Sequence, residues 1–444
     1  MFAQVQGIRW GLAGALAVLV LSGFARAAER PPNFIVILTD DQGYGDLGCY
    51  GAEGIRTPEI DRMAAEGTRF TCFYATAPIC TPTRAALMTG SYPPRVGLGT
   101  PLHTPDRYGL NREEITLAEL LKEAGYATGC VGKWHLGHHE PFLPLNHGFD
   151  FYYGTPMGHM FFTTVEESKR TDHFLRNGER IPHPPAEDLT ELFTDEAVAF
   201  IERNRERPFF LYLAHTMPHI PLLPPADFRG KSEGGVYGDI IESIDASTGR
   251  VLQAVRDAGL AENTYVIFTS DNGPNPGDGS PGPYRGGKHG AYEGGVRVPG
   301  IVWAPGRVPA GGVCDELAST MDLYPTLARL AGAEVPADRI IDGRDITPLF
   351  HGEAGAKSPH EQFIYYVREG KTGGIRVGDW KLLVDVKAGP WNHTGEALYN
   401  LAEDPSEQKD LAAERPEKAA ELRRKLEAAD GELRRNARPA GVLK

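Results

Sequence analysis

Four short apolar runs, each followed closely by polar residues, constrain the fold of this chain most strongly. The first, residues 33–39, is rich in β-branched residues and shows no alternation of apolar and polar side chains, which is typical of a strand buried on both faces. Further strands are predicted at 127–131, 209–214 and 265–269, with helical patterns between them. This order predicts an α/β fold, in which a large, mostly parallel sheet is flanked by helices on both faces.

Two of the predicted helices carry clear end signals. Thr57 and Pro58 are placed to cap and to open one helix. Thr116 and Glu119 form a capping box for a second helix, which ends at Gly125. Both helices fit between predicted strands and support the alternating order.

A group of polar residues follows each of the four predicted strands. These residues are Asp40 and Asp41 after the first strand, Lys133 and His135 after the second, His219 after the third, and Asp271 and Asn272 after the fourth. In open α/β sheets, ligands bind at the edge formed by the carboxyl ends of the strands. We therefore expect these side chains, which come from distant parts of the chain, to meet at one edge.

The apolar pattern changes beyond about residue 349. Short strands are predicted at 363–367, 375–384 and 398–401, with turns at Gly373–Gly374 and Gly378–Asp379, and a charged helix runs from Pro416 to about residue 429. We therefore expect a main α/β domain at 28–355 and a smaller C-terminal α+β domain at 356–444. The second domain would hold a short antiparallel sheet, one helix and a frayed tail from Asn436.

The first 27 residues predict a signal peptide. Arg9 precedes an apolar run at 11–24, and Ala25-Arg26-Ala27 fits a cleavage site. The alternative is an uncleaved membrane anchor, for which the run is short. Because no other stretch is apolar enough to cross a membrane, we expect an exported chain, periplasmic or secreted, with no stable membrane insertion after cleavage. The net charge of −13, without a basic tract, argues against nucleic acid as a partner.

A thiol at the start of a predicted helix is the strongest sign of chemistry. Cys80 lies two residues before Pro82, which favours a helix start, and Arg84 follows one turn later on the same face. Because the N–H groups at a helix start favour negative charge, this arrangement suits an enzyme that acts on an anionic ester. The alternative is a buried apolar residue or half of a disulfide. With five cysteines, an exported chain keeps at least one thiol unpaired.

The carboxylates at the strand ends predict a metal site. Asp40, Asp41, Asp271 and Asn272 supply hard oxygen ligands, which suit Ca²⁺ or Mg²⁺. Turn formation is the alternative use of such residues. Three carboxylates at one edge would, however, be costly to bury without a cation.

Lys288 adds a further charge, within the glycine-rich segment 285–290. Glycine there permits close approach of the backbone to a ligand, although a flexible surface loop is the alternative. For Lys133, His135 and His219 the alternatives are a solvated lysine and buried histidines.

These segments resemble those of the sulfatase family, within the alkaline phosphatase superfamily, and most of all its arylsulfatase A-type branch. The matching segments are Leu38–Gly48, Cys80–Gly90, Gly132–Gly137, His219–Pro221, Ser270–Gly273, Lys288 with Tyr292–Arg297, Leu398–Leu401 and Asp404–Pro405. They span nearly the whole chain after the predicted signal peptide. The order Cys-x-Pro-x-Arg followed by Leu-x-Thr-Gly is highly specific to this family.

The resemblance implies that a formylglycine-generating maturation enzyme oxidises Cys80 to Cα-formylglycine. The hydrated aldehyde would attack sulfur, displace the alcohol and then eliminate sulfate. The resemblance also implies a Ca²⁺ ion, or Mg²⁺, held by Asp40, Asp41, Asp271, Asn272 and residue 80, which would polarise a sulfate oxygen. Asp271 would also orient the nucleophile or accept its proton.

Roles for the remaining charged residues follow from the same resemblance. Arg84, Lys133 and Lys288 would hold the sulfate group. His135 would assist the diol and its elimination, while His219, or Lys288, would protonate the leaving oxygen.

Two positions depart from the family pattern. Thr83 stands where Ser or Ala is common, but the surrounding Cys, Pro and Arg remain, so we expect the modification to be retained. Gly158 stands where a Ser often precedes the His, here His159, which removes one possible contact to sulfate.

Three functions remain open on the sequence. The first is hydrolysis of sulfate esters, either aryl sulfates or sulfated carbohydrates. The second is hydrolysis of phosphate or phosphonate esters by a member of the same superfamily, because a cationic, metal-bearing site accepts either anion. The third is a carbohydrate-binding relative without activity, against which the complete set of functional positions argues.

Overall fold

The computed structural model describes residues 1–4, 30–160, 173–385 and 393–443. It divides into residues 1–30 and a second compact unit, residues 31–444, to which the following description applies. Most of the predicted signal peptide, residues 5–29, lies outside the described residues. Among the helices that are described, none is both long and apolar enough to cross a membrane.

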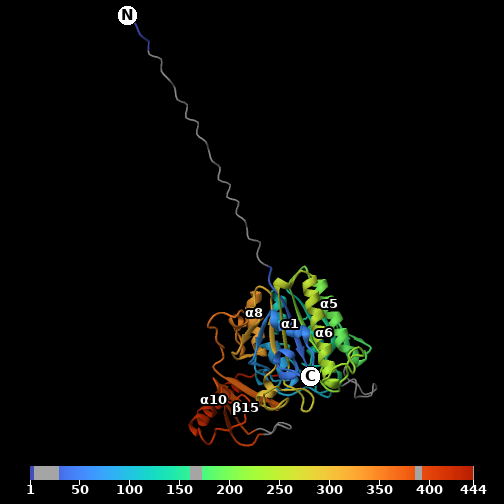
Figure 1. Ribbon diagram of the computed structural model, residues 1–444, viewed down its shortest axis with the longest axis vertical. Coiled ribbons are helices and arrows are strands. Elements are labelled where there is room, and N and C mark those ends of the chain that lie inside the picture. The colour runs from blue at the N-terminus through green and yellow to red at the C-terminus, as the bar shows by residue number, and fades with distance from the viewer. Residues whose placement is uncertain (5–29, 161–172, 386–392, 444) are drawn as a thin grey trace. The chain divides into compact units, whose positions relative to one another are not determined.

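A large sheet forms the centre of residues 31–444 (Figure 1). Its ten described strands are, in spatial order, β12 (Gly312–Cys314), β2 (Thr68–Phe70), β11 (Gly300–Trp303), β10 (Thr264–Ser270), β1 (Asn33–Thr39), β9 (Phe209–Ala214), β5 (Ala127–Lys133), β6 (Phe151–Thr155), β7 (Phe174–Arg176) and β8 (Glu179–Ile181). The central strands, from β10 to β6, run parallel, and antiparallel pairs occur toward both edges. The predicted α/β fold with a mostly parallel sheet is confirmed.

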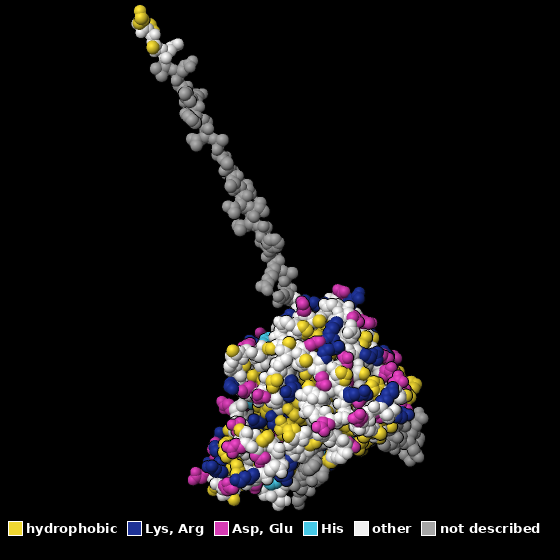
Figure 2. All heavy atoms as spheres, in the orientation of Figure 1, with side chains coloured by type: hydrophobic (Ala, Val, Ile, Leu, Met, Phe, Trp, Pro, Cys, Tyr) yellow, Lys and Arg dark blue, Asp and Glu magenta, His cyan; other side chains and the backbone are white. Residues whose placement is uncertain are grey.

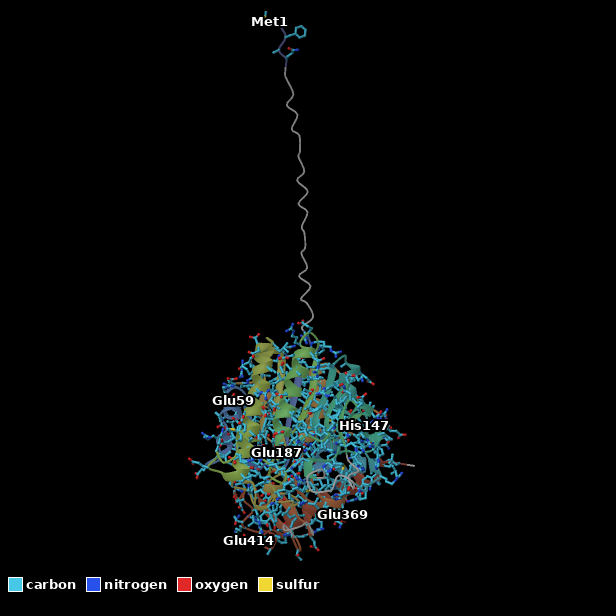
Figure 3. The ribbon with its side chains drawn as sticks, turned by 90° about the vertical axis from the view of Figure 1, so that its right-hand side faces the viewer. Met1, Glu59, His147, Glu187, Glu369 and Glu414 are labelled. Atoms are coloured by element: carbon cyan, nitrogen blue, oxygen red, sulfur yellow. The ribbon has the colours of Figure 1, made fainter. Side chains whose placement is uncertain are left out.

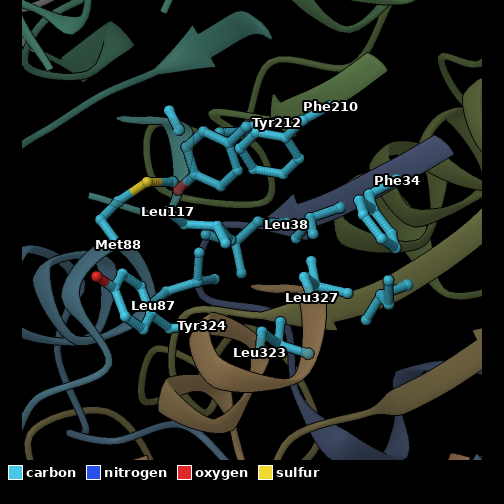
Figure 4. Close-up of a cluster of buried hydrophobic side chains, with 14 of the residues drawn as sticks. Phe34, Leu38, Leu87, Met88, Leu117, Phe210, Tyr212, Leu323, Tyr324 and Leu327 are labelled. Carbon is cyan, nitrogen blue, oxygen red and sulfur yellow. The ribbon is translucent and has the colours of Figure 1, made fainter. Parts of the chain in front are cut away.

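Helices cover both faces of this sheet. They are α1 (Pro58–Glu66), α5 (Leu189–Asn204) and α6 (Gly235–Asp257) on one face, and α2 (Cys80–Thr89), α3 (Leu117–Glu123) and α8 (Leu323–Ala331) on the other. Two hydrophobic cores result, and β1 contributes to both: Val36 and Leu38 point into one, and Ile35 and Ile37 into the other. Figure 4 shows the first core, in which Leu38 lies among side chains from α2 and α8.

The C-terminal elements form a smaller α+β layer, as predicted. It consists of an antiparallel sheet of β14 (Phe363–Val367), β15 (Lys371–Val377), β16 (Trp380–Leu383) and β17 (Ala397–Asn400), covered by α10 (Pro416–Arg435). Figure 3 shows the elements next to Glu369 and Glu414 together at one end of the unit. A third core joins this layer to the rest of the unit, because it also contains Tyr74 and Tyr92.

Three local predictions were wrong. The side chain of Thr57 does not cap α1; instead, the carboxylate of Asp245 on α6 accepts hydrogen bonds from the N–H groups of Glu59 and Ile60. Gly373–Gly374 lies inside β15 rather than at a turn, because Gly374 pairs with both neighbouring strands, and a Cβ there would lie 2.3 Å from a backbone oxygen of β16. A Gly pair therefore marks close packing here and not a change of direction.

The third wrong prediction concerns the end of the chain. The tail beyond residue 436 is not frayed, since β18 (Gly441–Val442) pairs with β4 (Tyr108–Gly109). Arg438 also donates to the buried carboxylate of Glu114, with its Nε 2.6 Å from Oε1. Pairing with a distant strand holds these residues in place, and such pairing cannot be predicted from so short a segment.

The surface carries both signs of charge. On the face shown in Figure 2, Lys and Arg side chains are interspersed with Asp and Glu. A site for an anion therefore needs a local concentration of cations rather than a field from the whole molecule.

Candidate active site

Four adjacent parallel strands bring the predicted polar residues to one edge of the sheet. In the order β10, β1, β9 and β5, the strand ends carry Asp271, then Asp40 and Asp41, then the segment to His219, then Lys133. Lys133 is the last residue of β5, which runs two residues further than predicted. The parallel arrangement therefore brings together residues that are far apart in the sequence, such as Asp41 and Asn272, which are separated by 231 positions.

Cys80 is the first residue of α2 and is only 3% exposed. The loop before it is fixed by Thr83, whose hydroxyl donates to the carbonyl of Ala77 at 2.7 Å and accepts from the Ala77 N–H. The hydroxyl group of Thr83 therefore stabilises the loop before α2. Burial raises the pKa of the Cys80 thiol to about 11, although two nearby lysines act in the opposite direction. None of the five cysteines, all of them among the described residues, forms a disulfide.

Arg84 lies fully buried behind Cys80. Its Nε and Nη2 donate to Oδ2 of Asp271 at 3.0 and 2.8 Å, and its Nη1 donates to the carbonyl of Lys133 at 2.9 Å. Nη2 also lies 3.6 Å from Oδ1 of Asp40. Arg84 thus connects the ends of β10, β5 and β1.

Each of the two adjacent aspartates pairs with its own lysine. Nζ of Lys133 donates to Oδ2 of Asp40 at 2.7 Å, and Nζ of Lys288 donates to Oδ2 of Asp41 at 2.6 Å. Burial opposes ionisation of both carboxyl groups, but Lys133 and His219 hold the pKa of Asp40 well below its usual value. Lys288 and His219 likewise lower the pKa of Asp41. Both aspartates are therefore charged at neutral pH.

Asp271 and Asn272 lie beside this pair. Oδ1 of Asp271 accepts from the N–H of Asp41 at 3.2 Å, and Nδ2 of Asn272 donates to Oδ1 of Asp41 at 2.8 Å. Burial, together with the charge of Asp40, raises the pKa of Asp271 to about 7, although Arg84 acts against this shift. The Asp271 carboxyl is thus the one of the three that exchanges a proton most readily near neutral pH.

The two predicted histidines present one ring nitrogen each to the site. Nε2 of His135 donates to the carbonyl of Leu102 at 3.0 Å, which leaves the buried Nδ1 as an acceptor without a hydrogen-bond partner among the described residues. Nδ1 of His219 donates to the carbonyl of Ile220 at 2.7 Å, so that Nε2 faces Oδ2 of Asp41 at 3.7 Å. Burial lowers the pKa of both rings and favours their neutral forms.

The residues present fit a divalent cation. Ligand atoms of Asp40, Asp41, Cys80 and His219 all lie within 4.8 Å of one another. Oδ1 of Asp40 and Oδ1 of Asn272 are buried and have no hydrogen-bond partner among the described residues, which is costly unless a cation meets them. His219, which the sequence did not suggest as a ligand, belongs to this group together with the predicted donors Asp40 and Asp41, whereas the predicted ligand Asp271 is not among the four.

A cavity of about 250 Å³ opens over these residues. Its described lining consists of Asp40, Ile79, Cys80, Pro101, Leu102, His103, Lys133, His135, Gly158, His159, Met160, His219, Ile220, Asn275, Lys288 and His289. Asn275 and His289 were not predicted as site residues. His289 could have been proposed from the sequence, because it follows Lys288 in the glycine-rich segment. Nothing in the sequence distinguishes Asn275.

Comparisons with known proteins decide the family. The family model described as Sulfatase matches residues 32–333, and the one described as N-sulphoglucosamine sulphohydrolase, C-terminal, matches residues 287–435. The chain belongs to the sulfatase family. It is therefore a sulfuric ester hydrolase.

Relatives of this sulfatase are similar over most of their length. The N-acetylgalactosamine-6-sulfatase of Canis lupus familiaris is 42% identical over 394 residues, which cover 82% of this chain and 74% of the relative. The steryl-sulfatase of Homo sapiens is 38% identical over 431 residues, which cover 77% of this chain and 73% of the relative. The crystal structure of Ps i-CgsB in complex with k-i-k-neocarrahexaose has a TM-score of 0.80 at 31% identity and covers 90% of this chain and 93% of that one.

One departure from the family pattern can be placed in the cavity of this sulfatase. A Cβ built on Gly158 would lie 3.4 Å from Cε of Lys133, in ordinary contact. A serine at this position would therefore adjoin Lys133, and the glycine leaves that space open.

Proposed function

We propose that this sulfatase hydrolyses the sulfate ester of a carbohydrate, by means of a Cα-formylglycine formed from Cys80 and a bound divalent cation. The position of Cys80 carries the proposal, because it opens α2 and lines the same cavity as Lys133 and Lys288. A carbohydrate is favoured because one relative is named for N-acetylgalactosamine and another was crystallised with a neocarrahexaose. An aryl sulfate would then serve as a laboratory substrate.

An unmodified thiol at residue 80 is poorly suited to attack. With a pKa of about 11, it stays protonated near neutral pH, and the thiol form is a weak nucleophile. Oxidation to the aldehyde, followed by hydration, supplies two hydroxyl groups on one carbon, so that one oxygen can displace the alcohol from sulfur and the other can release the sulfate. The maturation enzyme that performs this oxidation would be a partner of the chain.

Charge balance favours an anionic substrate. Asp40, Asp41 and Asp271 carry three formal negative charges, which Arg84, Lys133 and Lys288 match. A divalent cation would make the site positive overall, and this attracts the single negative charge of a sulfate ester. We assign sulfate binding to Lys133 and Lys288, which line the cavity. Arg84, which is buried and bonded to Asp271, would hold the other groups in place as well as add positive charge.

The histidines and Asp271 would move the protons. Nδ1 of His135 is a bare acceptor, suited to take a proton from the hydroxyl that remains on residue 80 when sulfate leaves. In its imidazolium form, which the nearby Asp41 carboxylate favours, His219 would protonate the leaving oxygen from Nε2, whereas Lys288 is tied to Asp41. Asp271, with a pKa of about 7, would accept the proton of the attacking oxygen.

The metal would be held by Asp40, Asp41, Asp271, Asn272 and residue 80. Its oxygen donors favour Ca²⁺, with Mg²⁺ as the alternative. A bound cation of this kind polarises a sulfate oxygen and favours the ionised nucleophile.

Two measurements on the natively expressed protein test the proposal. Mass spectrometry of the peptide that contains residue 80 should find the aldehyde or its hydrate in place of the thiol. Turnover of 4-nitrophenyl sulfate should exceed that of 4-nitrophenyl phosphate, and the variant Cys80→Ala should lose both. An active protein with an unmodified thiol would exclude formylglycine, and faster turnover of the phosphate would favour the phosphate or phosphonate ester hydrolase instead.

Export is a separate proposal. We propose that residues 1–27 are a cleaved signal peptide and that the chain acts in the periplasm or outside the cell. N-terminal analysis of the mature protein from the exported fraction should then begin at Ala28. A protein that retains Arg9 and the apolar run would instead indicate a membrane anchor.

A further inference from the structure

His289 is held in a strained position at the wall of the cavity. Its φ of 77° lies in the left-handed region, which residues other than glycine seldom adopt. Its N–H donates to the carbonyl of Pro78, two residues before Cys80, at 2.8 Å. A strained backbone that persists next to the nucleophile suggests that the side chain is required there.

The imidazole of His289 has hydrogen-bonding capacity that the protein itself does not use. Its Nδ1 is buried and has no hydrogen-bond partner among the described residues, and the ring is partly exposed to the cavity. Burial and the neighbouring Lys288 lower the pKa of the ring to about 4, so it is neutral at neutral pH. A neutral imidazole donates from one nitrogen and accepts at the other, which suits a hydroxyl group.

The surrounding wall combines polar and apolar groups. Asn275, whose Nδ2 donates to Oδ2 of Asp278 at 2.6 Å, lines the cavity together with the apolar Pro101, Leu102 and Ile220, and Ile220 is 39% exposed. A sugar ring has the same two characters, with C–H groups on its faces and hydroxyl groups around its edge. At about 250 Å³, the cavity is smaller than the roughly 300 Å³ at which pockets for drug-sized ligands begin. It therefore suits one sulfated sugar unit.

The charges around the cavity favour a sugar without a second negative group. Lys133 and Lys288 are the ammonium groups of the described lining, and each lies within 2.7 Å of a carboxylate oxygen. Arg368 lies close enough to affect the pKa of His289, but it is exposed and does not line the cavity. Among the described lining residues, a uronate or a second sulfate group would thus meet His289 and Asn275 rather than an unpaired cation.

We propose that His289 is a specificity-determining residue which, with Asn275, hydrogen-bonds the hydroxyl groups of a neutral, monosulfated sugar unit whose ring lies against Pro101, Leu102 and Ile220. This inference rests on the proposed function of the same site. It adds the part of the site that recognises the leaving alcohol.

The test compares two substrates in one variant. His289→Gly removes the ring and suits the local backbone, because glycine adopts a positive φ without strain, so the variant should fold. Purified enzyme is assayed with 4-nitrophenyl sulfate, with a panel of neutral monosulfated hexoses and N-acetylhexosamines, and with glucosamine 2-N,6-O-disulfate. For the best sugar, we expect the ratio of its kcat/KM to that of 4-nitrophenyl sulfate to fall at least tenfold, mainly through KM. His289→Asn, which also tolerates this backbone and keeps a polar group, should recover part of the loss.

Asn177→Gly is the matched control. It places glycine at another residue with positive φ, in the turn between β7 and β8, outside the cavity lining, and should leave the ratio within twofold of that of the unaltered protein. An equal ratio in His289→Gly and the unaltered protein would overturn the role of His289. Failure of the unaltered protein to hydrolyse any sugar of the panel, or a preference for glucosamine 2-N,6-O-disulfate, would overturn the substrate class. Failure on 4-nitrophenyl sulfate as well would overturn the proposed function itself.

Discussion

At the scale of single residues, the backbone of Asp41 allows two consecutive carboxylates to take different partners. Its φ of 71° lies in the left-handed region, which Asp tolerates better than most residues. The chain turns there, so that Asp40 meets Lys133 while Asp41 meets Lys288 and Asn272. The pairing keeps both carboxylates ionised, which is the state that a metal ion requires.

Removal of one carboxylate oxygen tests the metal site. We expect Ca²⁺ to stabilise the protein, by about 2.7 kcal/mol at 100 times its Kd, because the ion binds the folded state. Asp40→Asn should greatly weaken this effect and reduce turnover of 4-nitrophenyl sulfate by at least 100-fold. Thermal unfolding with increasing Ca²⁺ measures the first effect, and steady-state kinetics the second.

Asp195→Asn, on the exposed side of α5, is the control and should behave like the unaltered protein in both assays. Equal stabilisation of Asp40→Asn and the unaltered protein by Ca²⁺ would remove Asp40 from the metal site.

The charged residues of the candidate site could be proposed from the sequence, because each follows a strand or lies in a recognisable motif, and the fold brings them together. The positions of Asn275 and His289 at the cavity could not be predicted, since they depend on the path of a loop that carries no periodic pattern. The orientation of Arg84, which only the fold directs toward Asp271, could not be predicted either.

At the scale of elements, α1 depends on a residue that is far away in the sequence. Asp245 of α6 accepts from the N–H groups of Glu59 at 3.2 Å and of Ile60 at 2.8 Å, and so satisfies the first turn of α1. The sequence favoured Thr57 for this purpose because local capping is the commoner solution. In the structure the Thr57 hydroxyl bonds Asp61 and the N–H of Gly48 instead. Strand and helix positions were predictable from local patterns, whereas a cap supplied by another helix was not.

This cap should make stability depend on pH. Burial raises the pKa of Asp245 to about 7 in the folded protein, above its ordinary value of 3.8. The unfolded state therefore loses its proton first, so the contribution of Asp245 is complete below pH about 4 and is lost as the pH rises through 7. Between pH 5 and 7, the free energy of unfolding should fall by about 2 kcal/mol more in the unaltered protein than in Asp245→Asn.

Urea unfolding at both pH values measures this difference. The comparison between the two proteins cancels the contributions of other titrating groups. A parallel pH dependence in both proteins would show that Asp245 is already ionised in the folded state at pH 5.

At the scale of the whole molecule, a buried ion cluster joins the C-terminal sheet to the segment that carries Lys288. Lys381 of β16 is fully buried, and its Nζ lies 2.8 Å from Oε1 of Glu293 and 2.9 Å from Oε1 of Glu407. Glu293 opens α7 (Glu293–Val296), five residues after Lys288, and its second oxygen accepts from the hydroxyl of Tyr74 at 2.6 Å. Gly295, also in α7, accepts from the N–H of Gly273, next to Asn272. The small sheet therefore supports the segments that carry Lys288 and Asn272 of the candidate site.

The proposed boundary between residues 355 and 356 can be examined through this cluster. Burial and the nearby Glu293 raise the pKa of Glu407 to about 7, although Lys381 acts against the shift. If Lys381 is replaced by Met, Glu407 stays buried without an ion-pair partner among the described residues, and Glu293 keeps only its longer pair with Arg297. We expect the free energy of unfolding to fall by about 3–5 kcal/mol. The same substitution at Lys371, which forms an exposed ion pair on neighbouring β15, should change it by less than about 1 kcal/mol. The double variant with Glu407→Gln should recover part of the loss, because it removes the carboxyl group that has lost its ion-pair partner. Urea unfolding monitored by circular dichroism measures all four proteins.

A single transition in each protein would mean that residues 356–444 unfold together with the main domain. A separate early transition found only in Lys381→Met would instead mean that the C-terminal layer is an independent domain. Its attachment to the main domain would then depend on this lysine.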